Sequence, residues 1–198
     1  MKKVPDIILR AIEPEDLDIL YKVENDISLW GVGVTNVPYS RYMLHDYIAS
    51  AVGEIYTDKQ VRLMIENSEH KIVGIVDIID FDPRHMRAEL GIVILCEYRR
   101  QGYAAAAVRK AISYARQILH LHQLYVFIDE ENKISLDFFE KVGFECSATL
   151  KDWLFTGEKY KNAVLMQYFY KKKRLKMLLK KKIFVPLQPQ TKQEDLVK

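Results

Sequence analysis

The chain has 198 residues, of which 49% are hydrophobic and 29% charged, and its formal net charge is +3. This balance excludes an intrinsically disordered chain, and the length predicts one core with a short extension, since domains typically hold about 100 to 200 residues. Apolar runs such as 72–79 fall far short of the roughly 20 residues that cross a bilayer, and Val4-Pro5-Asp6 interrupts any export signal, so we expect a cytoplasmic protein.

The charge is unevenly distributed along the chain. Residues 171–198 hold ten Lys or Arg against Glu194 and Asp195, a formal charge of +8, which leaves about −5 for residues 1–170. A mildly acidic domain favours cationic small molecules over nucleic acids as partners. We therefore divide the chain into a domain, 1–170, and a basic C-terminal helix and tail, 171–198. Leucines at helical spacing in 171–182 leave open an amphipathic helix that binds a membrane or RNA. Because this stripe is short, we favour a solvated terminal helix that packs on its own subunit or on a neighbour.

The first forty residues predict a strand, a helix and an irregular segment. Residues 7–12 are typical of a strand, and Pro14 with two acidic residues marks the start of a helix whose apolar face includes Leu17, Leu20 and Tyr21. Glycines and Pro38 interrupt any regular pattern over 25–40, which favours a site-forming loop. Ser40 then predicts the cap of a helix that ends near residue 52.

The centre of the chain predicts a strand meander followed by a βαβ crossover. We expect strands at 61–67, 71–81 and 87–95, a helix at 103–119 and a strand at 124–128. Helical spacing relates Ala107, Ala111, Tyr114, Ala115 and Ile118, so we expect these residues to face the sheet. A helix at 134–142 and two strands at 144–155 and 159–170 complete a mixed sheet with helices on its faces.

The two cysteines predict neither a metal site nor a disulfide. Cys96 and Cys146 lack CxxC or CxxH spacing, so we expect two buried free thiols and no metal.

The segment Arg99-Arg100-Gln101-Gly102-Tyr103-Ala104 lies between a predicted strand and a predicted helix. Backbone N–H groups at a helix N-terminus lack helical partners and carry partial positive charge, which favours a phosphate, and the two arginines add full charges. An ordinary strand–helix connection remains an alternative for this spacing.

The same segment resembles the RxxGxA signature of the GNAT superfamily of acyl-CoA N-acyltransferases, with Arg99, Gly102 and Ala104 in the signature positions. The resemblance extends upstream to 87–91 and downstream to 129–132 and 139–144. The two ends, Leu9-Arg10 with 15–17 and then 157–162, are similar to the spermidine acetyltransferase branch. The resemblance therefore covers residues 7–170.

The resemblance implies a single GNAT-like α/β domain whose mixed, mostly antiparallel sheet is splayed between 87–95 and 124–128. Acetyl-CoA would lie in this opening, and homodimers or larger homo-oligomers are implied as well. The implied cofactor contacts are Ile92, Val93 and Ile94 through the main chain, the turn of Arg99, Arg100, Gln101, Gly102, Tyr103, Ala104 and Ala105, and Asn132, Ser135 and Phe139 after it.

The chemistry of acetyl transfer requires an amine to be positioned and deprotonated. Glu89 matches the family's acidic residue beside the thioester, so the resemblance implies a general base acting through a water; a carboxylate paired structurally to a base is the alternative. Many relatives carry a Tyr where Phe139 stands, as the donor of a proton to the leaving thiolate. We therefore expect Phe139 to face the sulfur without supplying a proton.

The acceptor is less defined than the cofactor. A polyamine needs carboxylates for its ammonium groups, and we assign Asp77 and Asp80 with Trp30 and Tyr39 as candidate contacts for a small amine. The spermidine branch carries an acidic pair where Thr35-Asn36 stands, which leaves an aromatic or sugar amine open. Two other functions remain: a non-enzymatic acyl-CoA sensor, motivated by Phe139, and a peptide or ribosomal-protein N-terminal acetyltransferase.

Overall fold

The computed structural model describes residues 4–30, 37–50 and 54–170, except for the side chains of Ser28 and Trp30. The helical elements are η1 (Pro14–Asp16), α1 (Leu17–Glu24), α2 (Ile27–Trp30), α3 (Arg41–Ser50), α4 (Ile55–Asp58), η2 (Cys96–Tyr98), α5 (Tyr103–Gln117) and α6 (Lys133–Lys141). The strands are β1 (Ile7–Ala11), β2 (Val61–Asn67), β3 (Ile72–Asp82), β4 (Arg87–Ile94), β5 (Gln123–Asp129), β6 (Glu145–Phe155) and β7 (Tyr160–Phe169).

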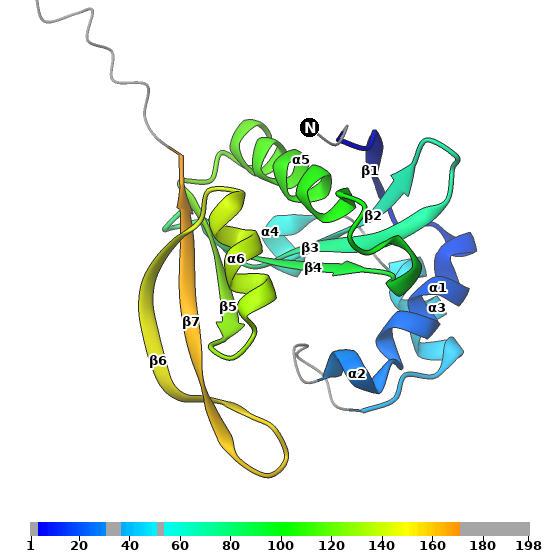
Figure 1. The fold of residues 1–198 in the computed structure, drawn as a ribbon. Helices are drawn as coiled ribbons and strands as arrows, with labels where there is room; N and C mark the ends of the chain where they lie inside the picture. The colour runs from blue at the N-terminus through cyan, green and yellow to red at the C-terminus, as the bar shows by residue number, and fades with distance from the viewer. Residues whose placement is uncertain (1–3, 31–36, 51–53, 171–198) are drawn as a thin grey trace, which may run out of the picture.

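The described strands form one sheet in the order β1-β2-β3-β4-β5-β7-β6 (Figure 1). Strands β4 and β5 run parallel, joined by the α5 crossover, and the other neighbours are antiparallel. A parallel pair needs such a helical crossover, whereas antiparallel neighbours can be joined by short turns, as β2–β3, β3–β4 and β6–β7 are. The predicted mixed, mostly antiparallel sheet is confirmed.

Helices cover both faces of the sheet because its strands alternate between two cores. On one face, Val76, Leu90 and Leu124 pack with Ala107 and Ala111 of α5. The small side chains of α5 let its backbone lie close to the strands. On the other face, Met64, Ile75 and Val93 pack with α1 and α3, through side chains such as Leu20 and Leu44. In Figure 1, α5 and α6 lie apart from α1, α2 and α3 accordingly.

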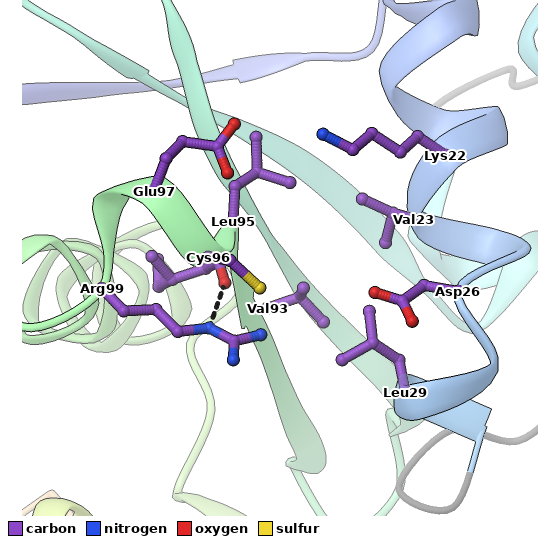
Figure 2. A pocket seen from close by; sticks show the side chains of 10 residues that line it. Lys22, Val23, Asp26, Leu29, Val93, Leu95, Cys96, Glu97 and Arg99 are labelled. Atoms are coloured by element: carbon purple, nitrogen blue, oxygen red, sulfur yellow. Dashed lines mark hydrogen bonds between the residues drawn. The ribbon is translucent and has the colours of Figure 1, made fainter.

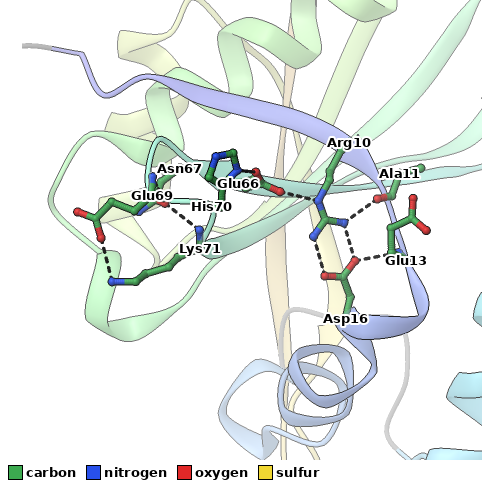
Figure 3. A network of polar contacts seen from close by, with 9 residues as sticks. All are labelled: Arg10, Ala11, Glu13, Asp16, Glu66, Asn67, Glu69, His70 and Lys71. Carbon is green, nitrogen blue, oxygen red and sulfur yellow. Dashed lines mark hydrogen bonds and ion pairs between the residues drawn. The ribbon is translucent and has the colours of Figure 1, made fainter.

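A polar network joins β1, the start of the first helical segment and β2 (Figure 3). Arg10 donates two hydrogen bonds to Asp16, at 2.7 and 2.8 Å, and a third to Glu66 at 2.7 Å. Burial alone would raise the pKa of Asp16, which is only 3% exposed, but hydrogen bonds from Arg10 and the Glu13 N–H bring that pKa below its ordinary value. Arg10, Asp16 and Glu66 therefore hold β1, the start of the helical segment and β2 together.

Three features differ from the sequence-based expectations. Cys96 and Cys146 are both exposed rather than buried, because Cys96 begins the η2 turn and Cys146 lies near the start of β6, a strand at the edge of the sheet. Ile118 is 61% exposed, since α5 ends at Gln117; the predicted Ala107, Ala111 and Ala115 are buried, and Val108 and Ile112 are buried in addition. The short helices α2 and α4 and the η2 turn carry no periodic signal and were not predicted. The predicted helix and tail at 171–198 lie outside the described residues, and no described helix is long and apolar enough to span a membrane.

Candidate active site

Strands β4 and β5 separate after three paired positions. Arg87, Ala88 and Glu89 pair with Gln123, Leu124 and Tyr125. Beyond Glu89, β4 continues to Ile94 and β5 to Asp129 without a further pair. The predicted splay is therefore present. Its β4 edge holds Ile92, Val93 and Ile94, whose main chain we predict to contact the cofactor.

The turn between β4 and α5 leaves helix donors open. Ala106 N–H is the first of α5 with a helical acceptor, Gly102 O at 3.1 Å. Gly102 is the N-cap and has no side chain to bond the N–H groups of Tyr103, Ala104 and Ala105. Arg99 and Arg100 are exposed beside them. This donor set, together with the helix dipole, fits a pyrophosphate.

The conformation of this turn depends on Gly102. Its φ is +93°, in the region that favours glycine, and an added Cβ would lie 3.1 Å from Pro5 Cδ. Two side chains brace the turn from within: Arg99 Nε donates to Ile94 O at 2.9 Å, and Gln101 Nε2 donates to Glu97 O at 2.8 Å. Arg99 thus has a structural contact in addition to its predicted phosphate contact.

A small cavity of about 110 Å³ lies between the end of β4 and the α1–α2 segment (Figure 2). Val93, Leu95 and Arg99 line it from one side, and Asp26 and Leu29 line it from the other. Figure 2 shows Arg99 reaching along this cavity from the η2 turn. The cavity therefore lies between the β4–α5 turn and the helical segments that precede the acceptor candidate Tyr39.

Glu89 is at the last paired position before the splay. Its neighbours Ala88 and Leu90 are buried in the α5 core, at 0% and 3% exposure, so alternation turns Glu89 to the opposite face. Burial, and then the negative charge of Asp80, raise the pKa of Glu89 to about 7. A carboxyl group with this pKa can accept and return a proton near neutral pH.

The second helix after the splay is capped by Asn132. Asn132 Oδ1 accepts a hydrogen bond from Ser135 N–H at 3.1 Å, so both residues help to begin α6. Phe139 is 6% exposed and packs between Phe138 and Phe144, with ring centroids 5.0 and 5.1 Å away. The cofactor contacts of Asn132, Ser135 and Phe139 remain predictions beside these structural roles.

The acidic acceptor candidates differ in their surroundings. Asp77 accepts two hydrogen bonds from Arg62, at 2.8 and 3.1 Å, and Arg62 also bonds Glu24. Burial opposes the charge of Arg62, but the two carboxylates raise its pKa above the ordinary value. Asp77 is thus already paired with a cation. Asp80 is exposed, and its φ of 50° places it in an irregularity of β3 beside Glu89.

The aromatic acceptor candidates are only partly described. Tyr39 is held at the end of α1, where the Asn25 side chain bonds its N–H and C=O at 2.9 and 3.1 Å. The Tyr39 side chain packs partly buried on the α1–α3 core. The side chain of Trp30 lies outside the described part of the chain. No group of His, Cys, Asp and Glu in the described ranges could hold a metal ion.

Sequence reasoning missed two residues of this site. Arg62 lies on β2 opposite Asp77, and only the strand register identifies that pair. Tyr125 lies opposite Glu89, on the same face. Burial, and then the charges of Glu89 and Asp80, raise the pKa of Tyr125 to about 12, so its hydroxyl stays protonated at neutral pH. The alternation of β5 is the one sequence signal that distinguishes Tyr125 from its buried neighbours.

Comparison with known proteins gives the same family as the resemblance of the segment at 99–104. The family described as "Acetyltransferase (GNAT) domain" matches residues 6–145. The chain is 29% identical over 170 residues to spermidine N(1)-acetyltransferase of Escherichia coli K12, covering 85% of this chain and 89% of that protein. It is 25% identical over 158 residues to a putative ribosomal N-acetyltransferase of Bacillus subtilis, covering 76% and 84%.

The fold is similar to solved structures of a spermidine N-acetyltransferase from Vibrio cholerae. A complex of that protein with CoA and spermine has a TM-score of 0.75 and 24% identity, covering 82% of this chain and 95% of the other. A dodecameric structure of it has a TM-score of 0.70 and 26% identity, covering 82% and 93%. The arrangement of the sheet and its helices is therefore shared.

Proposed function

The chain belongs to the GNAT acetyltransferase family, and we propose that it moves the acetyl group of acetyl-CoA to a primary amine of a small polyamine-like acceptor. The observation that carries this proposal is the position of Glu89, a carboxyl group with a pKa of about 7 beside the opening between β4 and β5. The resemblance to spermidine N-acetyltransferases supports a polyamine.

Different segments of the opening bind different parts of acetyl-CoA. The open N–H groups at the start of α5, with Arg99 and Arg100, bind the pyrophosphate. The unpaired edge of β4 at Ile92, Val93 and Ile94 binds the pantetheine arm through backbone groups. Acetyl-CoA supplies the acetyl group as an activated thioester. Backbone N–H groups on this edge stabilise negative charge on its carbonyl oxygen.

Glu89 prepares the amine for attack. A primary ammonium has a pKa near that of Lys, about 10.4, and is therefore protonated at neutral pH. The Glu89 carboxylate, directly or through a water, takes the proton so that the neutral nitrogen attacks the acetyl carbon. The C–N bond forms, the C–S bond breaks, and coenzyme A leaves as a thiolate that takes its proton from water. The same negative charge, with that of Asp80, favours binding of the cationic acceptor. Asp77 contributes less as an ammonium ligand because Arg62 occupies both of its oxygens.

We also infer that the protein assembles as a homo-oligomer, which the dodecameric relative supports. Two other functions would be distinguished by the same assay. A sensor would bind coenzyme A without turnover, and a ribosomal-protein acetyltransferase, which one relative's description suggests, would act on peptides.

The test is release of free coenzyme A thiol from acetyl-CoA over a panel of polyamines, monoamines, aminoglycosides and peptides. We expect polyamines to give the highest kcat/KM, and mass spectrometry to show one added acetyl group on the amine. Binding of coenzyme A with no thiol release from any acceptor would contradict acetyl transfer. Thiol release with peptides alone would show that the acceptor is a peptide and not a polyamine.

A further inference from the structure

The face that carries Glu89 continues across β5 as a row of aromatic rings. Glu89 and Tyr125 are direct partners, so their side chains are neighbours on one face of the sheet. Leu124 and Val126 are buried in the opposite core, at 0% and 2% exposure, which turns Tyr125 and Phe127 to the Glu89 side. The rings of Tyr125 and Phe127 pack edge to face, 5.5 Å apart.

Trp153 extends this row onto β6. Its ring lies 5.7 Å from that of Phe127, tilted by 32°. The β6–β7 register is irregular between Leu150 and Leu154, and such irregularities redirect side chains relative to a regular strand. Trp153 is nevertheless 57% exposed. We name the row of Tyr125, Phe127 and Trp153 the aromatic stripe.

The charges beside the stripe favour a cation. At its inner end, the carboxyl groups of Glu89 and Asp80 both act on Tyr125. Asp82 and Arg87 lie near as well, and they pair with each other at 3.3 Å. The aromatic faces offer negative electrostatic potential to an ammonium group and an apolar surface to an alkyl chain. A surface of this kind suits a chain that is apolar along its length and cationic at its ends.

We infer that the aromatic stripe is the acceptor subsite, which binds the distal ammonium and alkyl chain of a long diamine or polyamine whose reacting amine lies at Glu89. This inference rests on the proposed function and adds the acceptor's length and second charge to it. The stripe selects elongated amines with two cationic ends over monoamines of equal length.

The hairpin end supplies a matched control. The β6–β7 ribbon projects beyond the helices there (Figure 1). Phe155 is 62% exposed and packs on Tyr160 at 5.1 Å, separate from the ring contacts of the stripe. Phe155 and Trp153 therefore match in exposure and differ in their connection to Glu89. A general effect of exposed aromatic residues on the hairpin would appear equally in both.

Fluorescence tests binding without turnover. Trp30 and Trp153 are the two tryptophans of the chain, so the Trp153 signal is the emission change that the parent protein shows and Trp153→Phe lacks. With coenzyme A saturating, we expect 1,8-diaminooctane and spermidine to change the Trp153 emission saturably. Octylamine, with one charge and the same carbon chain, should require at least tenfold higher concentration. Equal titrations for the diamine and the monoamine would overturn the second-cation contact.

Kinetics then test the contribution of each ring. We expect Trp153→Ala to raise the KM for 1,8-diaminooctane about 2- to 5-fold, the range of one solvent-exposed cation–aromatic contact, with kcat changed less than twofold. Trp153→Phe should restore most of the affinity. Phe155→Ala should leave KM unchanged, and octylamine, which lacks the distal charge, should respond less than the diamine to Trp153→Ala.

The outcomes separate this inference from the proposed function. Absence of thiol release by the parent protein with every amine would contradict acetyl transfer itself. Normal thiol release with the same diamine KM in Trp153→Ala and Phe155→Ala would overturn only the stripe. A changed assembly mass of Trp153→Ala by light scattering, with no diamine effect on Trp153 emission, would assign the stripe to a subunit contact and also overturn the inference.

Discussion

The carboxyl group of Glu89 is partly buried and lies beside that of Asp80. Arg62 is already paired with two other carboxylates, Asp77 and Glu24. The consequence is a group that titrates near neutral pH, since burial and the charge of Asp80 raise its pKa to about 7. We expect kcat/KM to rise with pH through about 7 as the Glu89 carboxylate forms. Glu89→Gln should lower turnover by roughly 10² to 10⁴ while coenzyme A affinity is retained. A pH profile that is the same in both proteins would assign the base elsewhere.

The same group predicts a pH-dependent stability. Its folded pKa is raised above the ordinary 4.5, so the folded state binds more protons than the unfolded chain between about pH 4.5 and 7. The stabilisation that the protonated group provides is complete below pH 4.5 and is lost as pH rises through 7. We therefore expect Glu89→Gln to raise the melting temperature relative to the parent at pH 8, with the difference shrinking toward pH 5. Parallel melting curves across this range would contradict the raised pKa.

Phe139 offers a second test at this scale. It lies in an aromatic cluster with Phe138 and Phe144 and lacks the hydroxyl that the resemblance leads us to expect. Phe139→Tyr adds one polar atom to a position with 6% exposure, a near-isosteric change. If proton delivery to the leaving thiolate limits the rate, turnover should rise by up to roughly tenfold, about 1.4 kcal/mol of barrier.

Steady-state kinetics of Phe139→Tyr with the best acceptor, alongside its melting temperature, separate two results. Higher turnover at unchanged stability places the hydroxyl at the sulfur. Lower stability with lower turnover identifies Phe139 as a core residue, because a buried hydroxyl without a partner costs about 1 to 3 kcal/mol.

At the scale of elements, the start of α5 carries the strongest prediction. Ala104 lies in the first turn, where an acidic side chain interacts favourably with the helix dipole. It would also repel a bound pyrophosphate. We expect Ala104→Glu to weaken coenzyme A binding at least tenfold more than Ala104→Gln, without a lower melting temperature.

Calorimetric titration of coenzyme A into Ala104→Glu and Ala104→Gln measures this difference. Equal affinities would remove the phosphate from this turn. Ala104 is a better position than Gly102 for the test, since any side chain at φ +93° beside Pro5 strains the turn itself.

The elements themselves were largely predictable, because strands and helices here follow clear apolar periods and turns follow Gly, Pro and Ser. The register between neighbouring strands was not predictable. Strand β2 shifts against β3 between Ile65 and Glu66, and β3 shifts against β4 between Ile79 and Asp82. Counting back from the β2–β3 turn without that bulge would place Arg62 opposite Val76 rather than Asp77. A bulge adds one residue without a compositional signal, so the ion pair and the setting of Asp80 required the structure.

Part of the candidate site was predictable from the sequence, and part was not. The position of the turn at 99–105, which we propose to bind phosphate, was predictable, since its residues are consecutive between a strand and a helix. Tyr125 and the ring contacts of Phe127 with Trp153 join strands that are distant in sequence. No local pattern relates residues 127 and 153, because the strand order puts β7 between β5 and β6.

At the scale of the whole molecule, the described core and the candidate cofactor contacts lie within residues 4–170. Tyr170 closes this unit by donating its hydroxyl proton to Ile112 O at 2.7 Å. We expect a chain that ends after Tyr170 to fold and to bind coenzyme A with an affinity within a factor of about three at physiological salt, where long-range charge effects are screened.

Removal of residues 171–198 also changes the net charge from +3 to about −5. We therefore expect the KM for a cationic acceptor to fall at low salt and to converge with that of the full chain as salt increases. Loss of coenzyme A binding on truncation, measured by calorimetry, would instead show that the segment contributes to the cofactor site.

The three-residue ladder between β4 and β5 has a dynamic consequence. In the described chain, it is the direct strand contact between two half-sheets, β1–β4 and β5–β7–β6, which are also joined by the α5 crossover, by the hydrogen bond from His122 N–H to Met86 O at 2.7 Å and by side-chain packing. Hydrogen-bonded strands open together, so each half should exchange its amide hydrogens with deuterium as a separate unit. A ligand that lies across the opening contacts both edges and must be released before either half opens fully. Saturating coenzyme A should therefore slow exchange in both halves by a common factor of 1 + [L]/Kd.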